Sequence, residues 1–337
     1  MATVLPYASG LNNPRGLHFG PDGYLYVAEG GVGGSHFTDG ECTQVRSDSV
    51  GPYSGSQSGS SITRIDRDGN KTPVATFPSS QTSPGSGALI SGVADLAFID
   101  GTMYALLAGA GCSHGVEQIP NGIARVNANG TWDLIANLSL YQMNHPTKVI
   151  NPPDFEPDGT WWSMVAVRGD LYAVEPNHGE MVKVTTDGSI TRVIDISASQ
   201  GHAVPTSIAY HGVFYVANLG QFDPEDLNTQ SIYRINPAGH IQVVTTGLSK
   251  VLGLAFDHRD RLYVLETSYS TSDPGPVPFT GRILRIEPNG KQTLVADHFF
   301  FPTGMTFGPD GALYVSNVGF GPPPFGLGEI KRVVLSD

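Results

Sequence analysis

The sequence has few charged residues, few cysteines and no long apolar run. Lys, Arg, Asp and Glu make up 15% of the 337 residues, and 19 basic residues stand against 31 acidic ones, a net charge of −12. Binding to a phosphate backbone needs clustered Lys and Arg, and no such cluster occurs here. We therefore expect no nucleic-acid partner and, for the same reason, no membrane partner. A membrane-spanning helix is not expected, because no stretch approaches 18 consecutive apolar residues.

Cysteine is almost absent, with Cys42 and Cys112 as the two examples. Neither belongs to a C-x-x-C pair, so a structural zinc site is not indicated. Two interpretations stay open: one disulfide in an oxidising compartment, or two free thiols. The chain begins Met1-Ala2 and enters strand-like sequence at once, as it would if a start methionine replaced a removed export leader.

Glycine and proline are abundant, with 42 and 25 residues, and many of them lie in the turns of a repeated strand pattern. Each repeat has an apolar strand with a tyrosine at one position, namely Tyr26, Tyr104, Tyr172, Tyr215, Tyr263 and Tyr314. A similar strand and a tight turn, such as the Gly-Pro-Asp-Gly of residues 20–23, precede it. A third strand alternates branched apolar with polar residues, and a second tight turn leads to a fourth. Four antiparallel strands per repeat are typical of a propeller blade.

The two ends of the chain complete the last repeat. The sixth repeat has three strands before the C-terminus, whereas residues 3–8 form a spare strand ahead of the first repeat. We therefore predict one all-β domain over residues 1–337, a six-bladed β-propeller with four antiparallel strands per blade, in which the N-terminal strand completes the last blade. Such closure leaves no open edge between the first and last blades.

Long connections are predicted on one face of the propeller and tight turns on the other. The long ones cover residues 30–60, 78–92, 108–121, 139–160, 219–230, 267–281 and 318–328. Binding residues concentrate on loops held by a rigid scaffold, and loops rich in Gly, Pro, Ser and aromatic residues suit a cavity with a few polar anchors. The predicted ligand-binding residues are Arg15, Glu29, His36, Tyr53, His114, Tyr141, His145, His178, Phe222 and Tyr269.

A series of polar residues lies three positions after the repeated tyrosines. It consists of Glu29, Glu175, Asn218, Glu266 and Asn317, and Leu107 interrupts it in the second repeat. Carboxylate and amide oxygens around a propeller axis suit Ca²⁺ or Mg²⁺, so these five residues are candidate metal ligands. The alternative is that each side chain accepts hydrogen bonds from loop amides of its own blade.

The signals for catalysis are weaker, because the sequence has no G-x-S-x-G elbow, phosphate loop or dinucleotide fingerprint. A loop histidine can act as a general acid or base near neutral pH. The candidate catalytic residues are His202 and, as its carboxylate partner, Glu175 or Glu266.

Several segments carry a resemblance to a known family. They are residues 9–17 (Ser-Gly-Leu-Asn-Asn-Pro-Arg-Gly-Leu), 20–23, 201–207 (Gly-His-Ala-Val-Pro-Thr-Ser), 302–304 and 308–317. In these segments the chain resembles the ScyD/ScyE family of bacterial propeller proteins, linked to biosynthesis of the extracellular pigment scytonemin. The resemblance implies a six-bladed fold and export, hence an extracellular or periplasmic location, but no established reaction.

The chain also looks more distantly like virginiamycin B lyase, gluconolactonase-like enzymes and strictosidine synthase, which are propellers with central sites. The gluconolactonase-like enzymes place a metal-binding Glu at the start of an innermost strand. Here the corresponding segments are 14–16 (Pro-Arg-Gly), 205–207 (Pro-Thr-Ser) and 302–304 (Pro-Thr-Gly), none of which contains Glu. This departure argues against a lactonase.

Three functions remain as hypotheses. The first is an exported protein that holds a small aromatic or hydrophobic molecule over the central channel, accessory to secondary-metabolite biosynthesis. The second is a lyase or hydrolase that uses Ca²⁺ or Mg²⁺ on a small molecule at the channel mouth. The third is a protein-interaction platform. The sequence names neither the ligand nor the reaction, and a monomer is the expected state.

Overall fold

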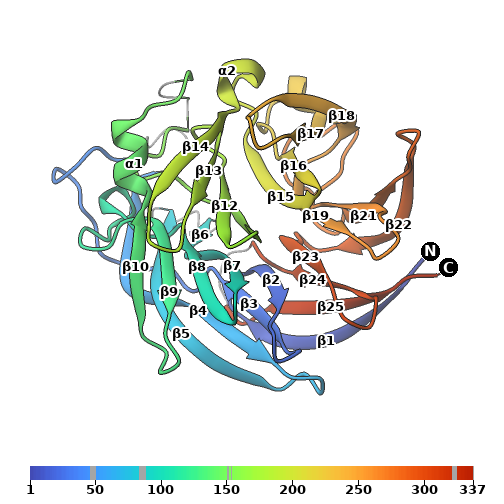
Figure 1. The fold of residues 1–337 in the computed structure, drawn as a ribbon, viewed down its shortest axis with the longest axis horizontal. Coiled ribbons are helices and arrows are strands. Elements are labelled where there is room, and N and C mark those ends of the chain that lie inside the picture. The colour runs from blue at the N-terminus through green and yellow to red at the C-terminus, as the bar shows by residue number, and fades with distance from the viewer. Residues whose placement is uncertain (46–50, 83–88, 150–151, 153, 321–324, 337) are drawn as a thin grey trace.

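The computed structural model describes residues 1–45, 51–82, 89–149, 152, 154–320 and 325–336, and shows six antiparallel sheets around a common axis (Figure 1). Blade one contains β2 (Pro14–Phe19), β3 (Leu25–Glu29), β4 (Tyr53–Ile65), β5 (Lys71–Thr82) and the short β6 (Ile90–Ser91). Blade two contains β7 (Val93–Ile99), β8 (Thr102–Leu107), β9 (Gly122–Val126) and β10 (Trp132–Asn137). Blade three contains β11 (Ser163–Val167), β12 (Asp170–Glu175), β13 (Glu180–Val184) and β14 (Ile190–Asp195).

The remaining blades follow the same order. Blade four contains β15 (Pro205–His211), β16 (Val213–Asn218), β17 (Gln230–Ile235) and β18 (Ile241–Leu248). Blade five contains β19 (Val251–Phe256), β20 (Leu262–Glu266), β21 (Gly281–Ile286) and β22 (Gln292–Phe299). Blade six contains β23 (Gly304–Phe307), β24 (Leu313–Asn317), β25 (Gly328–Val334) and, from the other end of the chain, β1 (Thr3–Leu11). The predicted six-bladed architecture is confirmed.

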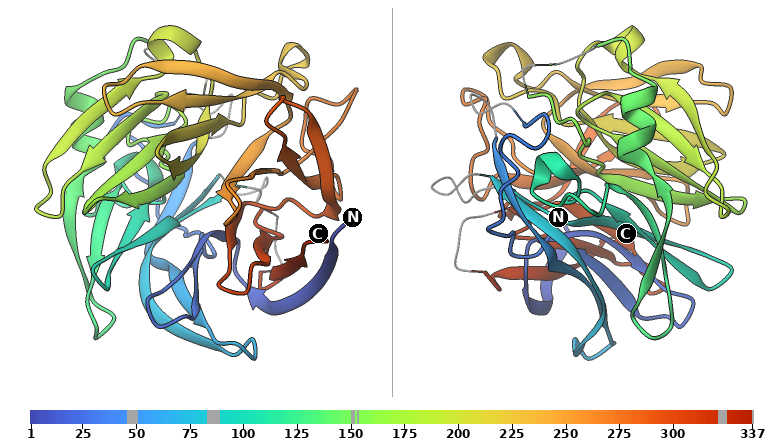
Figure 2. Two further views of the ribbon diagram at one scale, coloured as in Figure 1. Left: turned by 45° about the vertical axis from the view of Figure 1, so that its right-hand side comes forward. Right: turned by 90° about the vertical axis from the view of Figure 1, so that its left-hand side faces the viewer.

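The first and last strands close the ring as predicted. β1 pairs antiparallel with β25, with Val4 opposite Val333 and Leu5 opposite Arg332. Both termini therefore lie together at the outer edge of blade six (Figures 1 and 2). The innermost strands of successive blades also contact one another all the way around the axis, so the sheets form a closed ring.

The repeated tyrosines have a clear packing role between blades. Tyr26, Tyr215, Tyr263 and Tyr314 each lie edge-on to a phenylalanine near the end of the innermost strand of the next blade, at ring-centroid distances of 5.2, 5.0, 5.3 and 5.0 Å. Edge-to-face pairs at this spacing add to the stabilisation from burial. The repeated tyrosines therefore mark positions at the interface between neighbouring blades.

Two long connections contain more regular structure than the sequence indicated. Strands β4 and β5 extend through segments predicted as loops, with Tyr53 opposite Thr82. The connection after β10 begins with helix α1 (Leu138–Asn144), capped by Asn137, whose side chain accepts the N–H of Leu140 at 2.8 Å. The other helical elements are α2 (Ser197–Gln200), η1 (Cys112–His114) and η2 (Pro224–Asp226). Among the described residues, none of these helices has the length and apolar character needed to cross a membrane.

Candidate ligand cavity and acid–base cluster on the loop face

The long connections of blades one to three line a cavity of about 530 Å³. Its lining is mostly apolar and includes Met143 on α1, Pro146, Val149, Phe155 and Pro157. The polar residues in the lining are few: Thr43, Gln142, Thr147, Asp158 and His178. An apolar cavity of this size with a few polar groups is the usual form of a small-molecule site.

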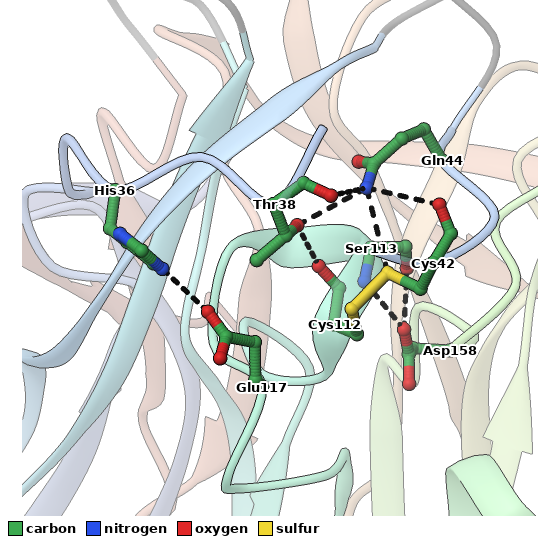
Figure 3. Close-up of a disulfide and its surroundings, with 8 residues drawn as sticks. All are labelled: His36, Thr38, Cys42, Gln44, Cys112, Ser113, Glu117 and Asp158. Atoms are coloured by element: carbon green, nitrogen blue, oxygen red, sulfur yellow. Dashed lines mark hydrogen bonds and ion pairs between the residues drawn. A yellow bond between two sulfur atoms is a disulfide. The ribbon is translucent and has the colours of Figure 1, made fainter. Parts of the chain in front are cut away.

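A disulfide builds one wall of this cavity. Cys42 and Cys112 are bonded, with their Cα atoms 6.3 Å apart, which decides between the two interpretations that the sequence left open. Thr38 Oγ1 donates to the carbonyl of Cys112 at 2.5 Å, and Gln44 Nε2 donates to the carbonyl of Thr38 at 2.7 Å (Figure 3). The disulfide thus fixes the connection after β3 to η1.

Asp158 joins this wall to the third connection. Its Oδ2 accepts both the backbone N–H and the hydroxyl of Ser113, at 2.8 and 2.6 Å (Figure 3). The carbonyl of Asp158 also accepts the hydroxyl of Ser139 at 3.0 Å. The disulfide and the hydrogen bonds of Asp158 therefore join three segments of the cavity wall that are distant in sequence.

His178 supplies an ionisable group at the cavity wall, and Glu175 holds it in place. The backbone N–H of His178 lies 2.5 Å, and its Nδ1 3.2 Å, from Oε2 of Glu175. Glu175 is fully buried, and its Oε1 accepts the N–H of Thr160 at 2.8 Å. Among the described residues, Nε2 of His178 has no hydrogen-bond partner, so that nitrogen is available to a ligand.

A buried acid–base cluster adjoins the cavity. Tyr53 Oη donates to Oε1 of Glu156 at 3.3 Å, and Nε2 of His114 lies 3.3 Å from Oε2 of the same carboxylate. The rings of Tyr53 and His114 stack with centroids 4.6 Å apart. Burial raises the pKa of Glu156, and the contact with His114 offsets part of that rise. Burial and the nearby Glu156 also raise the pKa of Tyr53 well above its usual value.

A second histidine–carboxylate pair lies at the other end of the cluster. His202 Nε2 is 2.9 Å from Oδ1 of Asp154. Asn177 ties Asp154 and Glu156 to blade three, because its Oδ1 accepts the N–H of Glu156 at 2.8 Å and its Nδ2 donates to the carbonyl of Asp154 at 2.6 Å. Along this segment Asp154 and Glu156 contact the cluster, whereas Phe155 lines the cavity.

The predicted pairing of His202 with Glu175 or Glu266 is not what the structure has. His202 contacts Asp154 instead, and Glu175 contacts His178. Glu266 pairs with Arg282, whose Nε lies 2.5 Å from Oε2 of Glu266. The sequence did not indicate Asp154, because its approach to His202 is a tertiary contact between residues that are distant in the chain.

The five candidate metal ligands occupy the last position of the second strand in five blades. Each accepts a backbone N–H: Glu29 from Asn12, Glu175 from Thr160, Asn218 from Ser231, Glu266 from Ser249, and Asn317 from Phe300, at 2.6 to 2.9 Å. Most of these donors lie in the connection that enters the blade, so the side chain holds that connection in place. Within the described ranges, no group of three His, Cys, Asp or Glu residues could hold a metal ion. This geometry favours the hydrogen-bonding alternative, and metal binding stays a prediction.

Several other predicted ligand residues lie away from the cavity. His36 pairs with Glu117 at 2.6 Å on an exposed surface (Figure 3). Tyr141 and His145 stack on each other at 4.4 Å, and neither lines the cavity. Phe222 is 51% exposed, and Tyr269 lies under the guanidinium of Arg282 at 3.4 Å. Phe222 and Tyr269 belong to the connections of blades four and five, which the cavity does not touch.

A smaller cavity of about 320 Å³ lies inside the ring, lined by the innermost strands of all six blades. Asp95 is its buried carboxylate, and it accepts the N–H of Met164 at 2.8 Å and lies 3.1 Å from Nε2 of His18. The loop-face cavity beside His178 is lined by blades one to three alone, so it differs from the predicted position over the central channel.

Comparison with known proteins identifies the fold and goes no further. The sequence matches no protein-family model, and it matches no curated protein. Among solved structures, it is similar to a streptogramin B lyase (14% identity, TM-score 0.51, covering 99% of this chain and 98% of that one). It is also similar to a gluconolactonase from Xanthomonas campestris (10%, 0.58, 99% and 90%). A third is a putative glucose dehydrogenase from Thermus thermophilus (16%, 0.58, 99% and 100%).

These three structures are named for three different reactions, so the shared propeller does not define the chemistry of this chain. The similarity to lyase and gluconolactonase propellers agrees with the more distant resemblance seen in the sequence. Membership of the ScyD/ScyE family stays a prediction.

Proposed function

We propose that this protein binds a small, largely apolar molecule in the cavity between α1, the Cys42–Cys112 disulfide and Phe155, with His178 as the polar anchor. The observation that carries the proposal is the combination, in one cavity, of an apolar lining with one oriented imidazole. Burial of apolar ligand surface supplies affinity in such a cavity, and the few polar groups fix the orientation.

An acid–base enzyme working in the same cavity is the second candidate. A buried carboxylate that holds Nδ1 of a histidine leaves Nε2 to move a proton, as in established histidine–carboxylate pairs. Glu175 and His178 have this relationship, and it supports a lyase or hydrolase that needs no metal. A substrate found by screening would test it: we expect His178→Gln to abolish turnover while binding persists.

The proposal includes export to an extracellular or periplasmic compartment and an accessory role in secondary-metabolite biosynthesis, as the ScyD/ScyE resemblance implies. The disulfide supports the first part, because such bonds persist in oxidising compartments.

A neutral apolar dye, N-phenyl-1-naphthylamine, tests binding without any contribution from charge. We expect saturable binding to the intact protein, detected by the fluorescence of the directly excited dye. Met143 and Leu140 provide a matched pair of sites, because both are exposed on α1 and only Met143 lines the cavity.

Met143→Glu should weaken dye binding by about fivefold, equivalent to the loss of about 1 kcal/mol of apolar contact, and Leu140→Glu should leave it unchanged. Equal effects of the two substitutions, or no saturable binding to the intact protein, would refute the proposed site.

A further inference from the structure

The side chain of Arg15 is a buried cation without a counter-charge. It is 5% exposed, at the start of β2, an innermost strand. Its Nη2 donates to the carbonyl of Ile90 at 2.5 Å. Its Nη1 has no hydrogen-bond partner, and no ion pair among the described residues involves Arg15. Buried arginines in proteins are normally paired with carboxylates or phosphates.

Two aromatic rings frame this guanidinium. Its central carbon lies 4.9 Å from the ring centre of Trp162 and 4.3 Å from that of Phe320. The two rings are themselves stacked, with centroids 5.7 Å apart. Cation–π contacts of this kind stabilise a desolvated guanidinium and fix its plane, but they do not satisfy its unpaired N–H group.

Arg15 keeps its positive charge although it is buried. Removal from water lowers the pKa of Arg15 to about 9, and the neighbouring Tyr53 opposes that change. The side chain therefore stays positive at neutral pH. A positive group with an unsatisfied donor, desolvated and held rigid by aromatic rings, has the properties of a recognition point for an anion.

We propose that Arg15, framed by Trp162 and Phe320, binds the oxyanion group of a small ligand at the loop-side end of the central ring. Trp162 also lines the cavity inside the ring, which places this point beside that space. The oxyanion is a carboxylate or a phosphate, since both match the two-pronged donor geometry of a guanidinium. This site is separate from the cavity at His178 and does not depend on it.

Calorimetric titration of the intact protein with sodium benzoate, sodium acetate and inorganic phosphate, in chloride buffer of constant ionic strength, tests the proposal. We expect saturable binding of at least one anion. Tighter binding of benzoate than of acetate assigns an aromatic carboxylate, whereas binding of phosphate alone assigns a phosphate ester. No binding of any of the three at millimolar concentration would overturn the proposal.

Arg15→Met should reduce that binding at least tenfold. The matched control is Arg64→Met, because Arg64 also lies over an aromatic ring, that of Tyr24 at 5.0 Å, but has a half-exposed side chain beside Asp22. The control should bind as the wild type does. Equal affinity in the wild type and Arg15→Met would overturn the proposal.

A second variant keeps the test decisive if Arg15→Met fails to fold. Arg15→Lys retains the charge and the length of the side chain but loses the guanidinium fork, so we expect it to fold and to bind the anion several-fold more weakly. Unchanged affinity in this variant would also contradict the proposal. Because the dye used for the His178 cavity is neutral, the failure of either site leaves the other intact.

Discussion

Nδ1 of His178 lies 3.2 Å from Oε2 of Glu175, the same oxygen that accepts the backbone N–H of His178 at 2.5 Å. Burial lowers the pKa of His178, but the charge and hydrogen bond of Glu175 outweigh burial and raise it. Burial likewise raises the pKa of Glu175, but the charge of His178 and the N–H of Thr160 bring it below its usual value. Each shift favours the charged form of its own group, so the contact favours an ion pair between Glu175 and His178.

Removing the carboxylate charge should reverse the shift at His178. In Glu175→Gln the imidazole stays buried but loses its counter-charge, so we expect its pKa to fall below the usual value for histidine. Titration of the imidazole signals by NMR measures this directly. An unchanged pKa at His178 would mean that Glu175 does not control it.

The pair also predicts how stability depends on pH. The raised pKa of His178 gives stabilisation that is complete below its unfolded value of 6.5 and is lost as pH rises through the folded pKa. The lowered pKa of Glu175 gives stabilisation that is complete above 4.5 and is lost as pH falls through the folded pKa. The contribution of the pair should therefore be largest between these two values.

Urea unfolding of the wild type and of the Glu175→Gln/His178→Gln double variant, across a pH series, measures that contribution. The difference in free energy of unfolding should peak between pH 4.5 and 6.5. A difference that is constant with pH would contradict the ion pair.

The disulfide should contribute strongly to stability, because it joins residues 70 positions apart. The Cys42→Ser/Cys112→Ser double variant should lose about 4 kcal/mol of unfolding free energy, as expected for a loop of this length. It should also bind the neutral dye more weakly, since one cavity wall is no longer fixed. Urea denaturation and dye titration test the two effects separately, and equal stability of the two proteins would show that the bond is dispensable.

Calorimetric titration with Ca²⁺ and Mg²⁺ distinguishes the two interpretations of the polar series. We expect no saturable binding, because the backbone N–H of Ser249 and the Nε of Arg282 already occupy Glu266. Glu266→Ala should instead lower the unfolding free energy by about 3 kcal/mol or more, since it leaves the charge of Arg282 without its partner. Saturable metal binding that disappears in Glu266→Gln would establish the metal site.

The sequence predicted the fold well because the propeller repeats its own signals. In four of the blades the repeated tyrosine marks a packing contact with the next blade, as between Tyr26 and Phe98. The extension of β4 and β5 was not predictable in this way. The run from Ser54 to Ser61 is rich in Ser and Gly and lacks alternation, so its strand state depends on pairing with β5.

The candidate site was predictable in part. Arg15, Tyr53, His114, His178 and His202 were identified from their places on long connections or at strand starts. The structure brings Tyr53, His114 and His178 near Glu156, whereas His202 contacts Asp154 and Arg15 lies near Tyr53.

Glu156 and Asp154 were missed, although acidic residues between the prolines of the 152–158 segment were a usable signal. Phe222 and Tyr269 were predicted with the others because they lie on the same face of the propeller. That face spans six blades, whereas the cavity is lined by blades one to three.

A crystal structure of the protein with bound N-phenyl-1-naphthylamine tests the central claim most directly. We expect density for the dye between Met143 and Phe155, in contact with the ring of His178. Density for the dye inside the central ring, or on the connections of blades four to six, with the cavity at His178 vacant, would contradict it.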